Sequence, residues 1–269
     1  MSISTIMPSK IITLTTDFGL KDPYAAEMKA TILSICSSTV IVDITHEIVK
    51  FNTRMGAFVL ASAVPYFPVG SVHVAVVDPG VGTRRRPIVI QTQRSFFVGP
   101  DNGLLVLAAE KQGILRIHEL TNPRFMLPKV SNTFHGRDIF APVAAHVLNG
   151  VKPEAFGPEI REAAKPEFAK VTRKNDALVG EVLHVDGFGN IITNISEKEV
   201  SQRQVKDAVN IELSSCKLKL RLCKAYGETE PREPLALIGS HDFLEIALNQ
   251  GNAAEKFKTK PGDKIKLLL

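Results

Sequence analysis

An aspartate and an arginine flank a glycine-rich turn in the first third of the chain, and together they could handle a proton and an anion. The apolar run that begins at Val74 stops at Asp78 and turns through Gly80 and Gly82 toward Arg85. Glycine lets the backbone fold back on itself, so a hydrogen-bonded pair between Asp78 and Arg85 is sterically allowed. Because ligands of open α/β sheets bind beyond the carboxyl ends of strands, Asp78 is a candidate to orient a base or bind a cation; the alternative is a simple turn aspartate.

Asp17 and His135 also stand where the sequence predicts the ends of regular elements. Asp17 follows a β-rich run, and its carboxylate could accept two hydrogen bonds from a vicinal diol such as a ribose, or bond its own backbone in a turn. His135 precedes a glycine in a loop, where it is either an acid–base group or a hydrogen-bonded surface histidine. Four other histidines lie in or beside expected strands and are interpreted as structural: His46, His73, His118 and His184.

The turn from Asp186 to Asn190 carries one carboxylate, one aromatic ring and one amide, a set that suits an adenine nucleoside. Phe188 offers a stacking face, Asn190 a donor and an acceptor for the base edge, and Asp186 a partner for an ammonium group. The Asp-Gly and Gly-Asn dipeptides in this turn are equally typical of a β-hairpin that binds nothing. Both interpretations stay open on the residues alone.

Composition and absent motifs narrow the classes of function. The 269 residues are 44% hydrophobic, with 33 Lys and Arg against 28 Asp and Glu, so a polycationic nucleic-acid-binding arm is not expected. We expect no export signal and no membrane span, which needs about 20 apolar residues. The three cysteines are interpreted as reduced thiols of a cytoplasmic protein. The sequence has no HExxH, P-loop, GxGxxG or GxSxG motif. This argues against a metal-dependent enzyme, a protein with a glycine-rich phosphate-binding loop and a serine hydrolase.

The elements that would position these residues alternate between strand and helix in the first half of the chain. Strands are expected at residues 11–16, 40–44, 72–77, 87–92 and 95–98, and helices after Pro23 and at 54–64, 104–111 and 138–148. Asp22 would cap the first helix, with Pro23 in its first turn. This alternation predicts an α/β domain with a mostly parallel sheet and helices on both faces.

The second half of the chain changes character. Residues 151–175 carry prolines and charges with little apolar periodicity, which indicates a linker. Beyond them, short apolar segments at 178–185, 191–195, 208–213, 217–224, 235–238 and 264–268 are separated by turn residues, as in a small all-β barrel or sandwich. We therefore predict an α/β domain over residues 1–170 and a barrel-like β domain over residues 171–269.

Several motifs taken together resemble the S-adenosylmethionine hydroxide adenosyltransferases, relatives of the fluorinase and chlorinase enzymes. In chain order they are Asp17-Phe-Gly, Asp78-Pro-Gly-Val-Gly-Thr with Arg85, Phe134-His-Gly-Arg-Asp, Phe188-Gly-Asn with Thr193-Asn, and Gly239-Ser240 with Ile246-Ala-Leu-Asn249 and Asn252-Ala-Ala. The resemblance runs nearly end to end. It implies a homotrimer whose active sites lie between the N-terminal domain of one subunit and the C-terminal domain of the next, and no cofactor besides the substrate.

The resemblance also implies a reaction, the hydrolysis of S-adenosylmethionine by attack of water or hydroxide at C5′ of the ribose, which releases adenosine and methionine. Asp78, Arg85 and His135 correspond to the family's catalytic set, with Asp78 or His135 taking the proton from water. The implied substrate contacts are Asp17 at the ribose hydroxyls, Asp186 at the methionine amino group, Phe188 near the base, Asn190 at adenine and Ser240 at the methionine carboxylate.

The chain departs from the halogenating relatives at three positions. Asp78 replaces their tyrosine, and Val81 replaces a threonine that contacts halide; a carboxylate repels an incoming anion but can accept a proton from water. In the last motif, His241 replaces an arginine. Two other classes stay open, namely a non-catalytic protein that binds S-adenosylmethionine or adenosine, and a metal-dependent phosphohydrolase that uses Asp17, Asp78 and Asp138.

Overall fold

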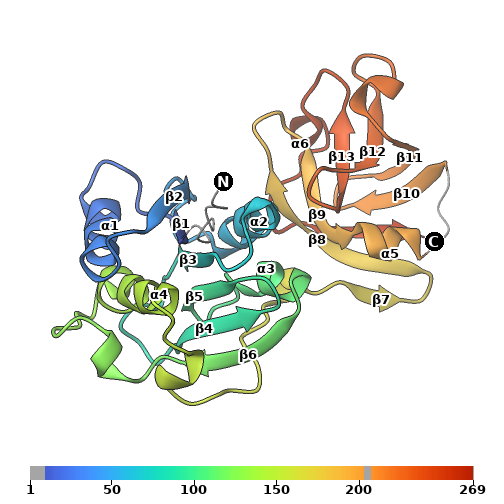
Figure 1. The fold of residues 1–269 in the computed structure, drawn as a ribbon. Coiled ribbons are helices and arrows are strands. Elements are labelled where there is room, and N and C mark those ends of the chain that lie inside the picture. The colour runs from blue at the N-terminus through green and yellow to red at the C-terminus, as the bar shows by residue number, and fades with distance from the viewer. Residues whose placement is uncertain (1–9, 203–206, 269) are drawn as a thin grey trace, which may run out of the picture. The chain divides into compact units, whose positions relative to one another are not determined.

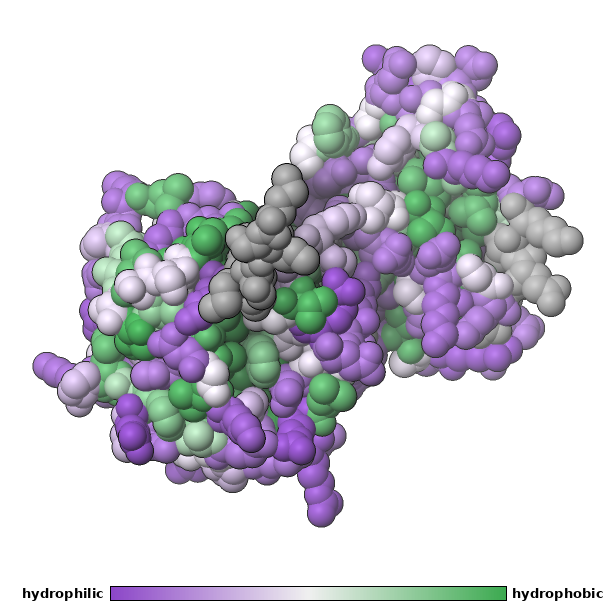
Figure 2. All heavy atoms as spheres, in the orientation of Figure 1, coloured by the Kyte–Doolittle hydropathy of each residue, from purple (hydrophilic) through white to green (hydrophobic). Residues whose placement is uncertain are grey.

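The computed structural model, which describes residues 10–202 and 207–268, divides into an N-terminal unit that ends at Lys165 and a C-terminal unit that begins at Pro166 (Figure 1). Each unit is built on a hydrophobic core of its own. Hydrophilic residues cover much of the face seen in Figure 2 in both units. Among the described residues, no helix combines the length and the apolar content that crossing a membrane would require.

The N-terminal unit contains a mixed six-stranded sheet in the order β2-β1-β3-β5-β4-β6. Its strands are β1 (Ile11–Thr16), β2 (Val40–Thr45), β3 (Val72–Val76), β4 (Pro87–Thr92), β5 (Phe96–Pro100) and β6 (Ile114–Glu119). β1 pairs in parallel with β2 and β3, and β3 pairs in parallel with β5, whereas β4 runs antiparallel to β5 and β6. Residues 93–95 join β4 to β5, and so short a connection permits only an antiparallel hairpin.

The helices of this unit are α1 (Tyr24–Ile35), α2 (Thr53–Ala63), α3 (Val106–Lys111) and α4 (Ala141–Leu148). The predicted Asp22 cap of α1 is wrong. Pro23 occupies the N-cap position with helical backbone angles, no side chain caps the helix, and Asp22 lies one residue too early to do so. The expected helix at 138–148 is also different, because a π-helical turn over Gly136–Phe140 precedes α4.

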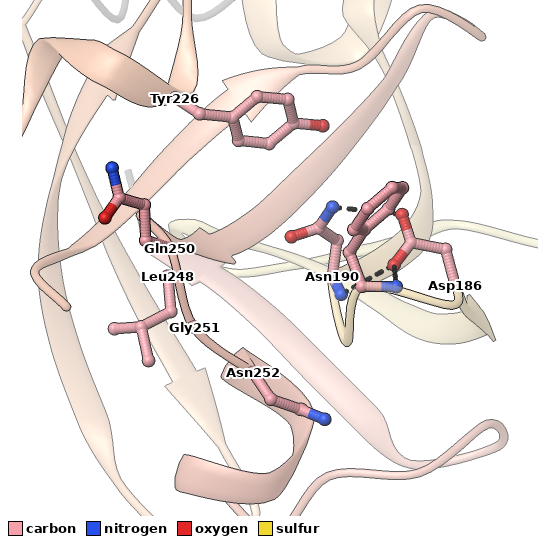
Figure 3. A pocket seen from close by; sticks show the side chains of 8 residues that line it. Asp186, Asn190, Tyr226, Leu248, Gln250, Gly251 and Asn252 are labelled. Carbon is pink, nitrogen blue, oxygen red and sulfur yellow. Dashed lines mark hydrogen bonds between the residues drawn. The ribbon is translucent and has the colours of Figure 1, made fainter. Parts of the chain in front are cut away.

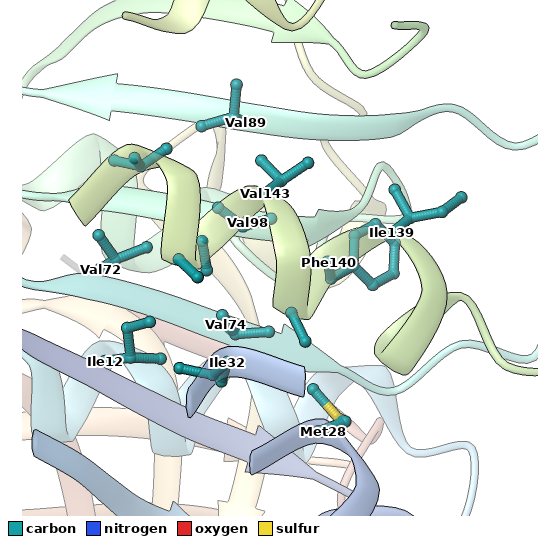
Figure 4. Packing of buried hydrophobic residues seen from close by; sticks show 14 of the residues in the cluster. Ile12, Met28, Ile32, Val72, Val74, Val89, Val98, Ile139, Phe140 and Val143 are labelled. Carbon is teal, nitrogen blue, oxygen red and sulfur yellow. The ribbon is translucent and has the colours of Figure 1, made fainter. Parts of the chain in front are cut away.

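Alternate residues of the segment formed by β3 and Val77, which directly follows it, enter two different hydrophobic clusters, as the two-residue period of a strand requires. Val72 and Val74 join a cluster that contains residues of α1 and α4, including Ile32 (Figure 4). Ala75 and Val77 join a cluster that contains residues of α2 and α3. The strand is therefore buried on both sides, and the loop after Val77 is the first part of this segment to reach solvent.

The segment predicted to be a linker belongs partly to the N-terminal unit, so this prediction is wrong for residues 151–165. Phe156 is 1% exposed within the first cluster, and Ile160 packs against the second. The Ile160 amide also donates to the Ile117 carbonyl of β6 at 2.8 Å. Single apolar residues between prolines and charges are buried here without any periodicity, which is why the sequence pattern missed them.

The C-terminal unit is a β-barrel, and one of the two predicted architectures is thereby confirmed. Its strands are β7 (Thr172–Lys174), β8 (Ala177–Val185), β9 (Ile191–Ser196), β10 (Ala208–Leu213), β11 (Lys217–Cys223), β12 (Pro234–Ile238), β13 (Phe243–Leu248) and β14 (Lys264–Leu268). Seven of them close a ring because β14 pairs with both β10 and β8, and β7 adds to β8 outside the ring. Two short helices, α5 (Glu197–Ser201) and α6 (Ala253–Lys256), complete the unit.

Candidate active site

Asp78 and Arg85 form a close pair in the loop that follows β3. Nε of Arg85 donates to Oδ1 and Oδ2 of Asp78 at 3.0 and 2.9 Å, and Nη2 donates to Oδ2 as well. The two side chains are 4% and 10% exposed, respectively. Nη1 of Arg85 is also buried and has no hydrogen-bond partner within residues 10–202 and 207–268. The guanidinium is therefore held by the carboxylate and keeps unused donors.

The turn between Asp78 and Arg85 depends on Gly82. This residue has a φ of +74°, and a Cβ atom there would lie 2.2 Å from the backbone oxygen of Asn132. Only a residue without a side chain lets the two loops approach this closely. Gly82 thus brings the loop of Asp78 against the loop that carries His135.

His135 completes a three-residue group, because Nη2 of Arg85 lies 3.0 Å from its Nδ1. A guanidinium can only donate, so Nδ1 accepts and the proton of the neutral imidazole is on Nε2. The pKa of His135 is lowered, first by burial and then by the positive charge of Arg85. The charges of Asp78 and Asp138 and a hydrogen bond with the Ser131 backbone act in the opposite direction. The imidazole is therefore favoured in its neutral form.

Asp138 is fully buried and holds the loop that presents His135. Its Oδ2 accepts from the amide and the hydroxyl of Ser131 at 2.8 and 2.7 Å, and its Oδ1 accepts from Nε of Arg137 at 2.7 Å. Both oxygens are thus engaged within the loop, which leaves Asp138 a structural residue. No group of three or more His, Cys, Asp or Glu residues in the described parts of the chain is arranged to hold a metal ion.

A pocket of about 400 Å³ lies beside this group, and its lining includes Asp17, Asp78 and His135. Asp17 is 6% exposed, and its Oδ2 accepts from the backbone amide of Phe51 at 2.9 Å. Phe51 lines the same pocket, has a φ of +63° and is 70% exposed. A left-handed backbone is unfavourable for phenylalanine, and such strain is concentrated at functional sites. Sequence reasoning did not select Phe51, since a backbone donor leaves no signal in the residue type.

His46 contacts residues on both sides of Asp17 in the chain, which agrees with the prediction that it is a structural histidine. Its Nδ1 lies 2.8 Å from the hydroxyl of Thr16, and that hydroxyl accepts from the Phe18 amide at 3.2 Å. Its Nε2 lies 3.1 Å from Oδ1 of Asp43, and its backbone oxygen accepts from the amide of Gly19. The residues before and after Asp17 are therefore both tied to the end of β2.

A second pocket, of about 520 Å³, lies in the C-terminal unit and is lined by Asp186, Phe188 and Asn190 (Figure 3). These residues form the hairpin between β8 and β9, so the hairpin prediction is confirmed. Oδ1 of Asp186 accepts from the amides of Phe188 and Asn190 at 2.9 Å, and Oδ2 accepts from Nδ2 of Asn190 at 3.0 Å. Phe188 is 82% exposed. Asp186 therefore orients the Asn190 amide.

The remaining residues that line this pocket were only partly predicted from the sequence. They are Tyr226, Leu248, Gln250, Gly251 and Asn252. Asn252 belongs to the last motif of the sequence and caps α6 by accepting from the Glu255 amide at 2.8 Å. Ser240 lies in an exposed turn between β12 and β13 and does not line this pocket.

Comparisons with known proteins cover almost the whole chain. The models of the SAM hydroxide adenosyltransferase N-terminal and C-terminal domains match residues 12–157 and 180–266. The (R)-S-adenosyl-L-methionine hydrolase of Methanocaldococcus jannaschii is 42% identical over 270 residues, which is 96% of this chain and 95% of the relative. The protein of the same name from Thermus thermophilus is 36% identical, covering 94% and 97%. The crystal structure of an uncharacterized conserved protein from Thermotoga maritima matches with a TM-score of 0.86 and 40% identity, covering 96% and 100%.

Proposed function

Because this chain belongs to the SAM hydroxide adenosyltransferase family, we propose that it hydrolyses S-adenosyl-L-methionine to adenosine and L-methionine. The family match extends over both units, and the two relatives named (R)-S-adenosyl-L-methionine hydrolase are aligned over nearly their full length. The substrate we propose therefore has the (R) configuration at sulfur. Two of the three departures from the halogenating enzymes, at Asp78 and Val81, also favour water over a halide as the nucleophile.

The observation that carries the proposal is the hydrogen-bonded group of Asp78, Arg85 and His135 beside the N-terminal pocket. The sulfonium makes methionine a good neutral leaving group, so the reaction needs no acid at sulfur. It needs a water that is held in line with C5′, shielded from bulk solvent, and a group that takes the proton of that water. A buried carboxylate beside a guanidinium suits this task.

Asp78 is the proton acceptor in this proposal. Arg85 keeps its protons, and Nδ1 of His135 already accepts from Arg85, so the imidazole is left to donate through Nε2. As the water oxygen bonds to C5′, the C5′–S bond breaks and its electron pair goes to sulfur, while the water proton passes to Asp78 and then to solvent. Arg85, which is hydrogen-bonded to Asp78 and to His135 beside the pocket, stabilises with its positive charge the negative charge that develops on the attacking oxygen.

The remaining predicted residues hold the substrate in this proposal. Asp17, fixed by the Phe51 amide, accepts from the ribose hydroxyls. One N–H of Nδ2 of Asn190 donates to Asp186, which leaves the carbonyl oxygen and the second N–H of Asn190 for the edge of adenine, with Phe188 against the base. Ser240 contacts the methionine carboxylate in this proposal, and Asp186 is the group nearest the methionine ammonium.

We also propose a homotrimer in which the N-terminal unit of one subunit and the C-terminal unit of the next complete each active site. The high exposure of Phe188, 82%, and of Phe51, 70%, supports this arrangement, since both residues line pockets and covering an exposed apolar residue is favourable. Sedimentation of the purified protein tests the subunit number. A monomer that is fully active would contradict the shared site.

We also propose that the sheet of the N-terminal unit is mostly parallel and that helices cover both of its faces. The parallel pairings among β2, β1, β3 and β5 support the first part. The second part is supported by the clusters, since α1 and α4 contribute to one and α2 and α3 to the other.

The test of the function is incubation of the purified protein with the (R) and (S) epimers of S-adenosyl-L-methionine, followed by chromatography. Adenosine and methionine should form from the (R) epimer, and the 5′ hydroxyl of adenosine should carry ¹⁸O when the solvent is labelled water. Activity should persist in a chelator, which separates this reaction from that of a metal-dependent phosphohydrolase. Binding of the substrate without product would show the non-catalytic alternative instead.

A further inference from the structure

Glu245 is a buried acidic residue of β13 that the proposed reaction does not use. It is 6% exposed, while its neighbours Leu244 and Ile246 belong to the barrel core. Because side chains alternate along a strand, Glu245 points to the other side of the barrel wall. A buried carboxylate is costly unless it is hydrogen-bonded, so its partners indicate why it is there.

The first partner is Tyr226, whose hydroxyl donates to Oε1 of Glu245 at 2.6 Å. Tyr226 begins a 3₁₀ turn (Tyr226–Glu228), and its ring lines the pocket of the C-terminal unit. In Figure 3 this ring and Asn252 lie at opposite ends of the pocket. Tyr226 is 42% exposed as a residue, so packing alone holds it incompletely. The hydrogen bond to Glu245 is what fixes the far end of the ring.

The carboxylate also lies against the turn that carries Ser240. A Cβ atom on Gly239 would lie 2.4 Å from Oε2 of Glu245, so the turn and the carboxylate are in direct contact. The turn is closed by the Asp242 amide, which donates to the Gly239 carbonyl at 3.1 Å. One carboxylate therefore contacts both Tyr226 and the segment of Ser240.

The charges around Glu245 keep the Tyr226 phenol protonated. Burial raises the pKa of Glu245 and the charge of Asp186 adds to this, whereas the bond from Tyr226 lowers it. The pKa of Tyr226 is raised, first by burial and then by its hydrogen bond to Glu245 and the negative charges of Glu245 and Asp186. The phenol therefore stays protonated and remains the donor.

We propose that Glu245 is a positioning residue for the nucleoside pocket: it fixes the Tyr226 ring as a preformed wall and seats the Gly239–Ser240 turn against the same carboxylate. A ring that is fixed before binding costs less ordering when an aromatic ligand packs against it. The ligand class is a purine nucleoside or its sulfonium derivative. This inference rests on the proposed function for the identity of the ligand, but not for the contact itself.

The test uses three variants and measures adenosine binding together with the kinetics of S-adenosyl-L-methionine hydrolysis. Glu245→Leu and Tyr226→Phe each remove the hydrogen bond, and we expect KM and the Kd of adenosine to rise by about ten-fold with kcat changed by less than about two-fold. Glu245→Gln is the matched control, because its amide oxygen still accepts from Tyr226, and it should stay within about three-fold of the native values. Adding Glu245→Leu to Tyr226→Phe should have little further effect.

A spectroscopic readout separates positioning from a general loss of structure. The chain has no tryptophan and three tyrosines, so the absorbance of tyrosinate in an alkaline titration follows three groups. One of them should ionise later than the others in the native protein, should ionise at lower pH in Glu245→Gln, and should be missing in Tyr226→Phe. An unchanged titration in Glu245→Gln would overturn the contact. Unchanged adenosine binding in both Glu245→Leu and Tyr226→Phe would overturn the positioning role.

These outcomes are distinguishable from a failure of the proposed function. If adenosine binds in a manner that depends on Glu245 while no S-adenosyl-L-methionine is consumed, the inference stands and the reaction does not. If the substrate is hydrolysed with the same KM by Glu245→Leu and by the native protein, the reaction stands and the inference is overturned. Tyr226→Phe alters a half-exposed side chain by one atom, which keeps the test valid even if Glu245→Leu does not fold.

Discussion

Nη2 of Arg85 donates to Oδ2 of Asp78 and lies 3.0 Å from Nδ1 of His135, so one amino group joins the carboxylate to the imidazole. This contact fixes the direction of every hydrogen bond in the group, since the guanidinium has donors only. It makes His135 an acceptor at Nδ1 and leaves Asp78 as the group able to take a proton. The predictions for the reaction follow from this direction.

Replacing Asp78 by Asn should lower kcat by at least about 100-fold, because the amide keeps the shape of the side chain but is a far weaker proton acceptor. The Kd of adenosine should change by less than about three-fold, since this residue acts on the water in our proposal. Steady-state kinetics and equilibrium binding of adenosine measure the two effects separately.

Asp101 offers a matched control for this substitution. It also pairs with an arginine, since Nε of Arg86 donates to its Oδ2 at 2.8 Å, and its side chain is likewise 4% exposed. It does not line either of the two pockets described above. Asp101→Asn should reduce the free energy of unfolding and leave kcat close to that of the native protein. If both variants lose activity equally, loss of structure would explain the result for Asp78.

His135 should set a pH dependence of kcat that lies below the ordinary range of histidine. Its pKa is lowered from 6.5, so the neutral imidazole that accepts from Arg85 persists below pH 6.5. Activity should therefore be constant through neutral pH and fall only as the pH drops through this lowered pKa. His135→Gln can still accept from Arg85 through its amide oxygen, so it should retain part of the activity and lose this acidic limb. An identical acidic limb in native and variant protein would contradict the assignment.

Asp17 should determine the preference for a ribose over a deoxyribose. In our proposal its carboxylate, held by the Phe51 amide at 2.9 Å, accepts from the ribose hydroxyls. The native protein should bind adenosine more tightly than 2′-deoxyadenosine, by about ten-fold, a difference of about 1.4 kcal/mol. Asp17→Ala should bind both with similar, weaker affinity. A preference that survives in Asp17→Ala would assign the ribose contact to another residue.

Gly82→Ala should damage the active site beyond the general cost of a left-handed alanine. Gly82 has a φ of +74°, and its Cβ would lie 2.2 Å from the Asn132 oxygen, so the loops of Asp78 and His135 must separate. We expect kcat to fall by at least about ten-fold, since misplaced catalytic groups are costly. Gly70→Ala is the control, because Gly70 has a similar φ of +88° with nothing within 4 Å of the added Cβ. Equal losses of activity in both would show that the clash is unimportant.

The local parts of the site could be predicted from sequence, and the long-range parts could not. Asp78 and Arg85 are seven residues apart with two glycines between them, so their pairing is encoded in one short turn. The contact between Asp17 and the Phe51 amide joins residues 34 positions apart. Its donor is a backbone amide, and the residue type does not show which backbone amide will act as a donor. The proton on His135 likewise depends on Arg85, 50 residues away.

The fold, too, has elements that can be predicted from the sequence and others that cannot. The strands of the barrel could be predicted where apolar segments alternate with turns, yet Phe243–Leu248 has all six residues buried and so lacks the alternation that marks a strand. The closure of the ring by β14 and β8 is a pairing that only the tertiary structure reveals. Glu245, inside that uniform strand, was missed for the same reason.

His73 should make the protein less stable as the pH falls below 6.5. It is fully buried between the rings of Phe67 and Phe97, its Nδ1 lies 2.8 Å from the Thr13 hydroxyl, and burial lowers its pKa to about 3. Between these two values the unfolded chain binds a proton that the native protein does not, which removes about 1.4 kcal/mol of stability per pH unit. The contribution is fully present above pH 6.5 and is lost as the pH falls toward 3. The free energy of unfolding in urea should therefore fall more between pH 7.5 and pH 5.5 for the native protein than for His73→Gln. An equal fall in both proteins would mean that His73 is protonated in the folded state.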